Sequence, residues 1–409
     1  MERALENTRK IFYNRGRHIM EEKEMLLQAA EKTAQELFAI ACDIFDHPEA
    51  DGKEFYASKL LTDYLEKKGF AVEKGIAGME TAFRATWEHG TGGPSMGFLL
   101  EYDALEGMGH ACGHHLQGPA CIGAALALME SCKDPFKLVL YGTPAEETVG
   151  GKIIMERQGC FRDVDAMFSY HTGGSTSIAY TNRALAPTRV TFHGIPAHAS
   201  GAPHLGRSAL DAMMLTFHGL EIMREHVKDG CRIHYTVLES TGVSNIVHEK
   251  ARAHITLRSY DRRYLEDMVK RMENVVKGAC LMTDTTAEFE YRNVYWNLVP
   301  VGTLNELALA TAKELGAEKI KEDKVISGGS TDVGNVSWVV PTVLVYTAFD
   351  NGGAHSEAWL AAGKTEKAHA SMLSAAKIMG TTALKLIADK ALLEKIKEEH
   401  RAAVSDEQA

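Results

Sequence analysis

The sequence lacks the features that mark several large classes of protein. No apolar run approaches the ~18 residues that span a membrane, and the charged stretch of residues 1–24 has no signal-peptide core. The net charge is −10 and there is no long basic run, which argues against a nucleic-acid partner. Seven scattered cysteines, an odd number, do not describe a disulfide framework. We therefore expect a cytoplasmic protein that binds neither membranes nor nucleic acid.

A chain of 409 residues is too long for one ordinary core, so two domains are expected. In the first part of the chain, short apolar strands alternate with helical patterns. This order predicts an α/β fold with a mixed, largely parallel sheet covered by helices on both faces. The expected buried strands are 96–100, 138–141, 166–170 and, later, 342–346.

The pattern changes at about residue 186, where a strand, a helix, two strands, a helix and a strand follow one another. That order is typical of the ferredoxin-like α+β fold. We expect the first domain to be discontinuous, with residues 1–184 and 299–409, and the inserted domain to cover residues 185–298. The polar C-terminal tail is expected to be frayed.

Polar residues of unusual type follow the expected strands. The segment 109–115 reads GHACGHH, and PAEE follows the second strand at 144–147. Because the carboxyl ends of parallel strands meet at one edge of a sheet, these side chains are expected to lie together. The set comprises Cys112, His114, Glu146, Glu147, His171 and His355, with Asp103 in a supporting position.

Three interpretations of this set compete. Each residue taken alone is most simply a surface or core side chain, and Cys112 alone could be a small buried hydrophobe. A Cys/His nucleophile pair lacks an orienting third group and leaves the two glutamates unexplained. Thiolate, imidazole and carboxylate together form the ligand set of zinc or another divalent transition metal. Metal binding is the better account.

The number of candidate ligands predicts two ions. Cys112, His114, Glu147, His171 and His355 are five, more than one catalytic ion normally takes. Two ions that share a bridging ligand and a water fit better, and Glu146 would then be available to act as general base on that water. Zinc or manganese is expected, with cobalt as a third alternative.

Nearly the whole chain resembles the aminoacylase and carboxypeptidase family of di-metal peptidases, and within it the amidohydrolase branch. The motifs that carry the resemblance are YDAL (102–105), GHACGH (109–114), PAEE (144–147), HGIPAHAS (193–200), APHLGRSALDA (202–212), STDVGNVSWVVPT (330–342) and AHS (354–356). The resemblance implies the same five metal ligands and the same base, Glu146. It also implies that the inserted domain is a lid that forms the dimer contact.

The resemblance assigns three further residues in the inserted domain. His198 would stabilise the oxyanion in the partner subunit's active site, and Asn245 and Arg258 would hold polar groups or a carboxylate of the substrate. A guanidinium suits a carboxylate because it binds in a fork, although Arg258 could equally be a solvent-facing strand residue. The chain departs from the family pattern at His115, where Asp or Asn is usual, and at Glu101, where Asp or His is usual.

We therefore expect a metallo-amidohydrolase that cleaves an N-acyl or aminoacyl amide bond of a small molecule such as an N-acyl-amino acid, a p-aminobenzoyl-glutamate-like compound or a dipeptide. Two alternatives stay open. The same site could remove ammonia from an aromatic amine or cleave another C–N bond, or the chain could be a non-catalytic metal-binding subunit. A homodimer is expected, or a heterodimer with a paralogous subunit.

Overall fold

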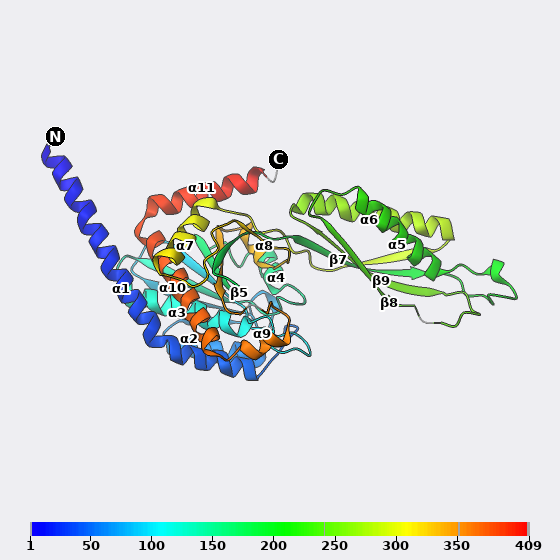
Figure 1. Ribbon diagram of the computed structural model, residues 1–409, viewed down its shortest axis with the longest axis horizontal. Coiled ribbons are helices and arrows are strands. Elements are labelled where there is room, and N and C mark those ends of the chain that lie inside the picture. The colour runs from blue at the N-terminus through cyan, green and yellow to red at the C-terminus, as the bar shows by residue number, and fades with distance from the viewer. Residues whose placement is uncertain (1, 241, 351, 407–409) are drawn as a thin grey trace. The chain divides into compact units, whose positions relative to one another are not determined.

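The computed structural model describes residues 2–240, 242–350 and 352–406. The chain divides into two compact units (Figure 1). Unit 1 contains residues 1–180, 299–326 and 335–409, and unit 2 contains residues 181–298 and 327–334. The short segment 327–334, which lies in the sequence range expected for the first domain, thus packs with unit 2.

Unit 1 is built on an eight-stranded sheet in the order β1-β2-β4-β3-β5-β12-β6-β11. The four central strands β4, β3, β5 and β12 are parallel neighbours, whereas β1, β2 and β6 pair antiparallel. The mixed, largely parallel α/β sheet predicted from the sequence is confirmed. The strands are β1 Ala71–Lys74, β2 Phe83–His89, β3 Ser95–Leu100, β4 Phe136–Gly142, β5 Ala166–Gly173, β6 Ser177–Thr181, β11 Val325–Ile326 and β12 Thr342–Ala348.

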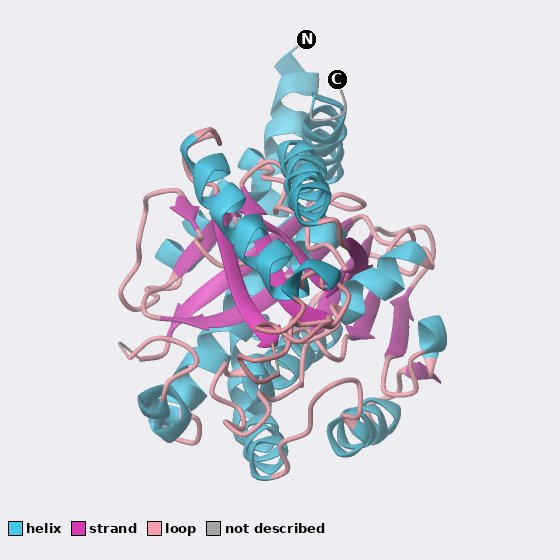
Figure 2. Ribbon diagram, turned by 90° about the vertical axis from the view of Figure 1, so that its right-hand side faces the viewer, coloured by secondary structure: helices cyan, strands magenta, loops and turns pink. Residues whose placement is uncertain are grey.

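Figure 2 colours the helices cyan and the strands magenta. α3 and α10 pack against the central strands, and α1 packs against both of these helices. Every residue of β3 is buried, which explains why this strand is a continuous apolar run rather than an alternating one. The helices of unit 1 are α1 Glu2–Asp46, α2 Phe55–Lys67, α3 Gln117–Ser131, α4 Gly151–Arg157, α7 Gly302–Glu314, α8 Val333–Ser337 (which begins in unit 2), α9 Glu357–Ala362, α10 Glu366–Ala388 and α11 Lys390–Asp406.

The C-terminal tail expected to be frayed is helical as far as residue 406, and residues 407–409 lie outside the described residues. Residues 390–406 form α11, and Leu393 and Ile396 from this helix are buried in the core of unit 1. His400 lies one turn further on the same face and contacts the backbone oxygen of Ser337 through Nε2 at 2.7 Å. The apolar spacing along an otherwise charged helix is enough to dock it.

Unit 2 has its own core and a four-stranded antiparallel sheet in the order β10-β7-β9-β8. Two helices, α5 and α6, pack on each other and on the sheet, and the elements follow the βαββαβ order expected from the sequence. The elements are β7 Ala184–His193, α5 Ala209–Glu225, β8 Arg232–Glu239, β9 Lys250–Ser259, α6 Arg262–Thr283 and β10 Thr286–Tyr291. Over the described part of the chain, none of the helices has the length and apolar character needed to cross a membrane.

Candidate metal centre

The candidate ligands all lie at one edge of the large sheet, at or beyond the carboxyl ends of its parallel strands. The Cys112 and His114 loop comes after β3, the PAEE turn comes after β4, and His171 lies near the end of β5 itself. His355 follows β12 and joins the others because its backbone N–H donates to the oxygen of Ala111 at 2.9 Å. This edge is where open α/β sheets place their binding sites.

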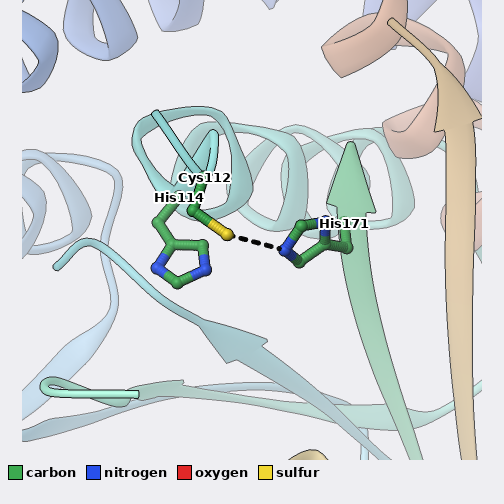
Figure 3. A group of neighbouring side chains, drawn as sticks. All are labelled: Cys112, His114 and His171. Atoms are coloured by element: carbon green, nitrogen blue, oxygen red, sulfur yellow. Dashed lines mark hydrogen bonds between the residues drawn. The ribbon is translucent and has the colours of Figure 1, made fainter. Parts of the chain in front are cut away.

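The structure brings the six expected side chains together in three overlapping groups. Within each group the potential ligand atoms lie within 4.8 Å of one another. Cys112, His114 and His171 form the first group, which Figure 3 shows with the three side chains pointing toward one another. The second contains Cys112, Glu147 and His355, and the third contains His114, Glu146 and Glu147. Because the groups share members, they form one continuous cluster rather than three separate sites.

His114 and His171 present the same ring nitrogen to the cluster. The Nδ1–H of His114 donates to Asp103 Oδ1 at 2.9 Å, and the Nδ1–H of His171 donates to the backbone oxygen of Thr172 at 2.8 Å. Each Nε2 therefore faces inward, and that of His171 lies 3.3 Å from the sulfur of Cys112. Hydrogen bonds of this kind fix the tautomer and the ring orientation of metal-binding histidines.

Asp103 supports two candidate ligands at once. While Oδ1 holds His114, Oδ2 accepts a hydrogen bond from the backbone N–H of Glu147 at 3.0 Å. Asp103 is almost completely buried and lies shortly after the end of β3. The loop between Cys112 and His114 also needs Gly113, because it has φ 91° and a Cβ there would lie 2.5 Å from Thr172 Oγ1.

Two candidate-site segments carry non-glycine residues in the left-handed region of the backbone. Ala145, just before the glutamate pair, has φ 58°, and His355 has φ 64°. Such conformations cost energy and persist where the surrounding structure holds them, often at functional sites. The two segments meet at the cluster, where Glu147 Oε1 lies 3.3 Å from His355 Nε2.

The charges of the cluster reflect its burial. Burial raises the pKa of Glu147, but contact with His355 and the charge of His114 outweigh it and bring the pKa to about 2. Burial lowers the pKa of His171, with a further contribution from His114, so this imidazole is in its neutral, ligand-competent form. Burial raises the pKa of the Cys112 thiol well above its ordinary value. A cation must therefore displace the thiol proton on binding.

The residues fit a pair of divalent cations. Among the described residues His114 Nε2 finds no hydrogen-bond partner although it is buried, a costly arrangement for a polar atom unless a ligand completes it. Together with the sulfur of Cys112 and the carboxylate of Glu147, this nitrogen provides the donors that zinc and similar ions accept.

Sequence reasoning missed a buried ion pair next to the cluster. Lys152 on α4 lies 2.7 Å from Glu101 Oε1, and both side chains are almost completely buried. Gln117, the first residue of α3, donates from Nε2 to Glu101 Oε2 at 2.6 Å. Burial raises the pKa of Glu101, but the charges of Lys152 and His114 lower it overall. The departure at Glu101 was visible in the sequence, whereas nothing there singles out Lys152 as an inward-facing lysine.

The three other expected residues lie in unit 2. His198 is exposed, and its Nδ1 accepts hydrogen bonds from the backbone N–H groups of Ser200 and Gly201 at 3.3 and 3.0 Å. The segment of Asn245 lies beside it, because the backbone oxygen of Asn245 accepts from Ala199 N at 2.9 Å.

Arg258 on β9 is half-buried and donates from Nη1 to Ser330 Oγ at 2.9 Å. Burial lowers the pKa of this guanidinium, and the positive charge of Arg183 lowers it further. Sequence reasoning did not identify Arg183. The two cations lie close enough to repel each other, so an anion between them would relieve the repulsion.

The sequence profile of peptidase family M20/M25/M40 matches residues 95–374, which include the whole ligand cluster. The chain belongs to this family. Across 91% of its length it is 31% identical to one of the subunits of p-aminobenzoyl-glutamate hydrolase from Escherichia coli (strain K12), covering 93% of that protein. It is 32% identical to the Xaa-Arg dipeptidase of Mus musculus, with 94% of each chain covered. This M20-family member is therefore a metal-dependent hydrolase that acts on amide bonds.

Solved structures share the fold. The aminobenzoyl-glutamate utilization protein of Klebsiella pneumoniae has a TM-score of 0.69 at 19% identity, covering 88% of this chain and 98% of its own. A Bacillus subtilis protein described as a dinuclear metal-binding peptidase of the M20 family has a TM-score of 0.67 at 17% identity, covering 87% and 99%. The predicted family resemblance is thus confirmed by sequence and by fold.

Proposed function

We propose that this M20-family hydrolase cleaves an N-acyl or aminoacyl amide and releases an amino acid, with Glu146 as the general base. The observation that carries the proposal is the place of Glu146. Its carboxylate lies within 4.8 Å of ligand atoms of His114 and Glu147 and is nearly buried, yet five other side chains supply the expected ligands. A carboxylate beside a metal pair, but not needed to hold it, is suited to move protons.

Each residue of the cluster has a role in this proposal. Cys112, His114, Glu147, His171 and His355 would hold two divalent ions, which supply Lewis acidity and lower the pKa of water. Glu146 takes a proton from the attacking water and returns it to the leaving amine. Asp103 holds His114 and Glu147 in position through its two oxygens. The sulfur, nitrogen and oxygen donors suit zinc or manganese, and cobalt is the third alternative.

The proposed substrate carries a carboxylate on its leaving side. Arg258, with Arg183 close by, offers a cationic place for that group, and Asn245 offers an amide for hydrogen bonding. The names of the relatives include a glutamate amide and an arginine dipeptide, both of which release an amino acid with a free carboxylate. We place this substrate among N-acyl-amino acids and dipeptides.

The proposed assembly is a dimer through unit 2, in which His198 stabilises the oxyanion in the partner's site. The exposed position of His198 in unit 2 is compatible with contact to another molecule. One relative is named as a subunit of its enzyme, so a heterodimer with a paralogous chain is the second form of this assembly. We also propose a cytoplasmic location, because Cys112 must stay reduced to serve as a ligand.

The test strips the purified protein of metal and reloads it separately with manganese, zinc and cobalt. Each form is offered p-aminobenzoyl-glutamate, Xaa-Arg dipeptides and a panel of acyl-amino acids, with products identified by mass spectrometry. We expect amide cleavage with at least one metal, and none from Glu146→Gln. Release of ammonia without amide cleavage would instead support the C–N deamination alternative. Metal binding without any turnover would favour the non-catalytic subunit.

A further inference from the structure

A fully buried ion pair borders the candidate metal centre. The Glu101 side chain is 3% exposed and that of Lys152 is 0% exposed. Taking two charges out of water is costly, and an apolar pair of similar volume is often as stable. The pair therefore needs an explanation other than stability.

Both oxygens of Glu101 are held, each by the helix that follows a ligand-bearing loop. Oε1 contacts Lys152 Nζ at 2.7 Å, and Lys152 lies in the first turn of α4, just after the turn with Glu146 and Glu147. Oε2 accepts from Gln117 at the start of α3, just after the loop with Cys112 and His114. The fold keeps α4 close to this turn, since a Cβ on Gly151 would lie 2.0 Å from the backbone oxygen of Pro144.

The same carboxylate lies beside a candidate ligand atom. Glu101 Oε2 is 3.4 Å from His114 Nε2, the inward-facing nitrogen of that ring. An unrestrained carboxylate at that distance from a ligand atom would swing toward a bound cation, because carboxylate oxygen is itself a good ligand. Lys152 and Gln117 hold it in place instead.

We infer that Lys152 is a positioning residue of the metal centre, which holds Glu101 out of the coordination sphere and cancels its charge. This inference rests on the proposed function. The five expected ligands contribute two negative charges, from the thiolate of Cys112 and the carboxylate of Glu147. With Lys152 in place Glu101 adds no net charge. Without it the cations would gain a third anionic ligand, the sixth ligand in all.

The two partners of the pair should therefore act in opposite directions. In Lys152→Met the carboxylate of Glu101 is released toward the cations, and we expect tighter metal binding. In Glu101→Gln the buried cation of Lys152 loses the opposite charge of Glu101 beside the centre, and we expect weaker binding. Changes near metal ligands typically alter affinity about 10- to 100-fold. If Lys152 only stabilised the fold, both variants would weaken binding.

The experiment titrates the metal-free protein with Zn²⁺ against a chelator of known affinity and records the absorption spectrum with Co²⁺. The Co²⁺ bands of Lys152→Met should lose intensity, as expected when the coordination number rises, whereas Lys152→Arg should retain the wild-type spectrum. Lys397→Met is the control. It removes a lysine 2.8 Å from Asp165, which precedes the amino end of β5 and so lies at the opposite edge of the sheet.

The double variant Glu101→Gln/Lys152→Met keeps the test valid if Lys152→Met does not fold. It removes both charges, so it should recover the affinity that Glu101→Gln loses. Three outcomes would overturn the inference about Lys152 without affecting the proposed function. They are shifts in metal affinity in the same direction for both single variants, no shift in either, and no recovery of affinity in the double variant. If the wild-type chain binds two ions in the same titration, the proposed metal centre still stands. A wild-type chain that binds no metal overturns the centre and, with it, this inference.

Discussion

The candidate ligands of unit 1 and the candidate substrate residues of unit 2 are held in different ways. In unit 1 the ligand cluster runs from the buried side chains of Cys112 and His114 to the exposed side chain of His355. A buried carboxylate or a backbone oxygen fixes the rings of His114 and His171, and the same carboxylate fixes the backbone of Glu147. In unit 2 His198 and Asn245 are exposed, and the ring of His198 is held by two backbone N–H groups next to it in sequence.

The difference follows from what each set has to bind. A metal ion requires ligand atoms in place beforehand, because misplaced donors lose affinity steeply. Residues that contact the substrate or a transition state can take up their final position when the substrate or a second chain binds. We therefore expect some variants to lose activity while they keep their metal, and others to lose the metal itself.

The largest effect is expected at the adjacent glutamates. Glu146→Gln should reduce kcat by about 10²- to 10⁴-fold, since a general base is removed, while metal content stays at the wild-type level. Glu147→Gln is the matched variant one residue along, and it should lose bound metal instead. Metal analysis and steady-state kinetics on both proteins separate the roles. Two variants with the same profile would show that the division between base and ligand is wrong.

His198→Ala should follow, with a loss of about 10²- to 10³-fold in kcat, as for removal of one oxyanion donor, and with full metal content. Mixing His198→Ala with Glu146→Gln under conditions of subunit exchange should restore part of the activity. One site of the mixed dimer then has Glu146 from one chain and His198 from the other.

Detection of mixed dimers through differently tagged chains is the control for that experiment. Mixed dimers that stay inactive, while His198→Ala alone is inactive, would place His198 in the site of its own subunit. A fully active His198→Ala would leave the histidine as an ordinary polar residue of its loop.

Sequence patterns predicted the parallel strands and the ligand edge because the buried strands are unmistakable. β3 and β4 are apolar along almost their whole length, so their ends, and the Cys, His and Glu residues beyond them, could be located. The antiparallel edge strands were not predicted. β1 is only four residues long and mostly exposed, and such a strand has no clear pattern until its neighbour is known.

The charges around the cluster were harder to predict than the ligands. Lysine is almost never fully buried without a partner, and the partner of Lys152 is Glu101, 51 positions earlier in the chain. Only the fold brings the two together, at the end of β3 and the start of α4. The proximity of Arg183 to Arg258 likewise depends on the packing of unit 2.

Asp103→Asn tests how strictly the ligands of unit 1 are held. An amide has one oxygen, so it cannot accept from both His114 Nδ1 and Glu147 N as the carboxylate does. Metal affinity should fall about 10- to 100-fold, measured by chelator competition. Asp165→Asn, at the opposite edge of the sheet, is the control and should bind metal like the wild type. Unchanged affinity in Asp103→Asn would mean that the ligands need no such support.

The smallest effect is expected at Ser330, whose hydroxyl accepts a hydrogen bond from Arg258 at 2.9 Å. Ser330→Ala removes this contact but keeps the guanidinium, so a substrate carboxylate loses orientation rather than charge. One such hydrogen bond contributes about 1 kcal/mol, which corresponds to a roughly fivefold higher KM with kcat nearly unchanged. Ser327→Ala is the matched control, because the hydroxyl of Ser327, in the same segment, accepts from the backbone N–H of Gly329. If Ser330→Ala lowers kcat instead, or if both serine variants raise KM alike, Arg258 does not hold the substrate carboxylate in the way proposed.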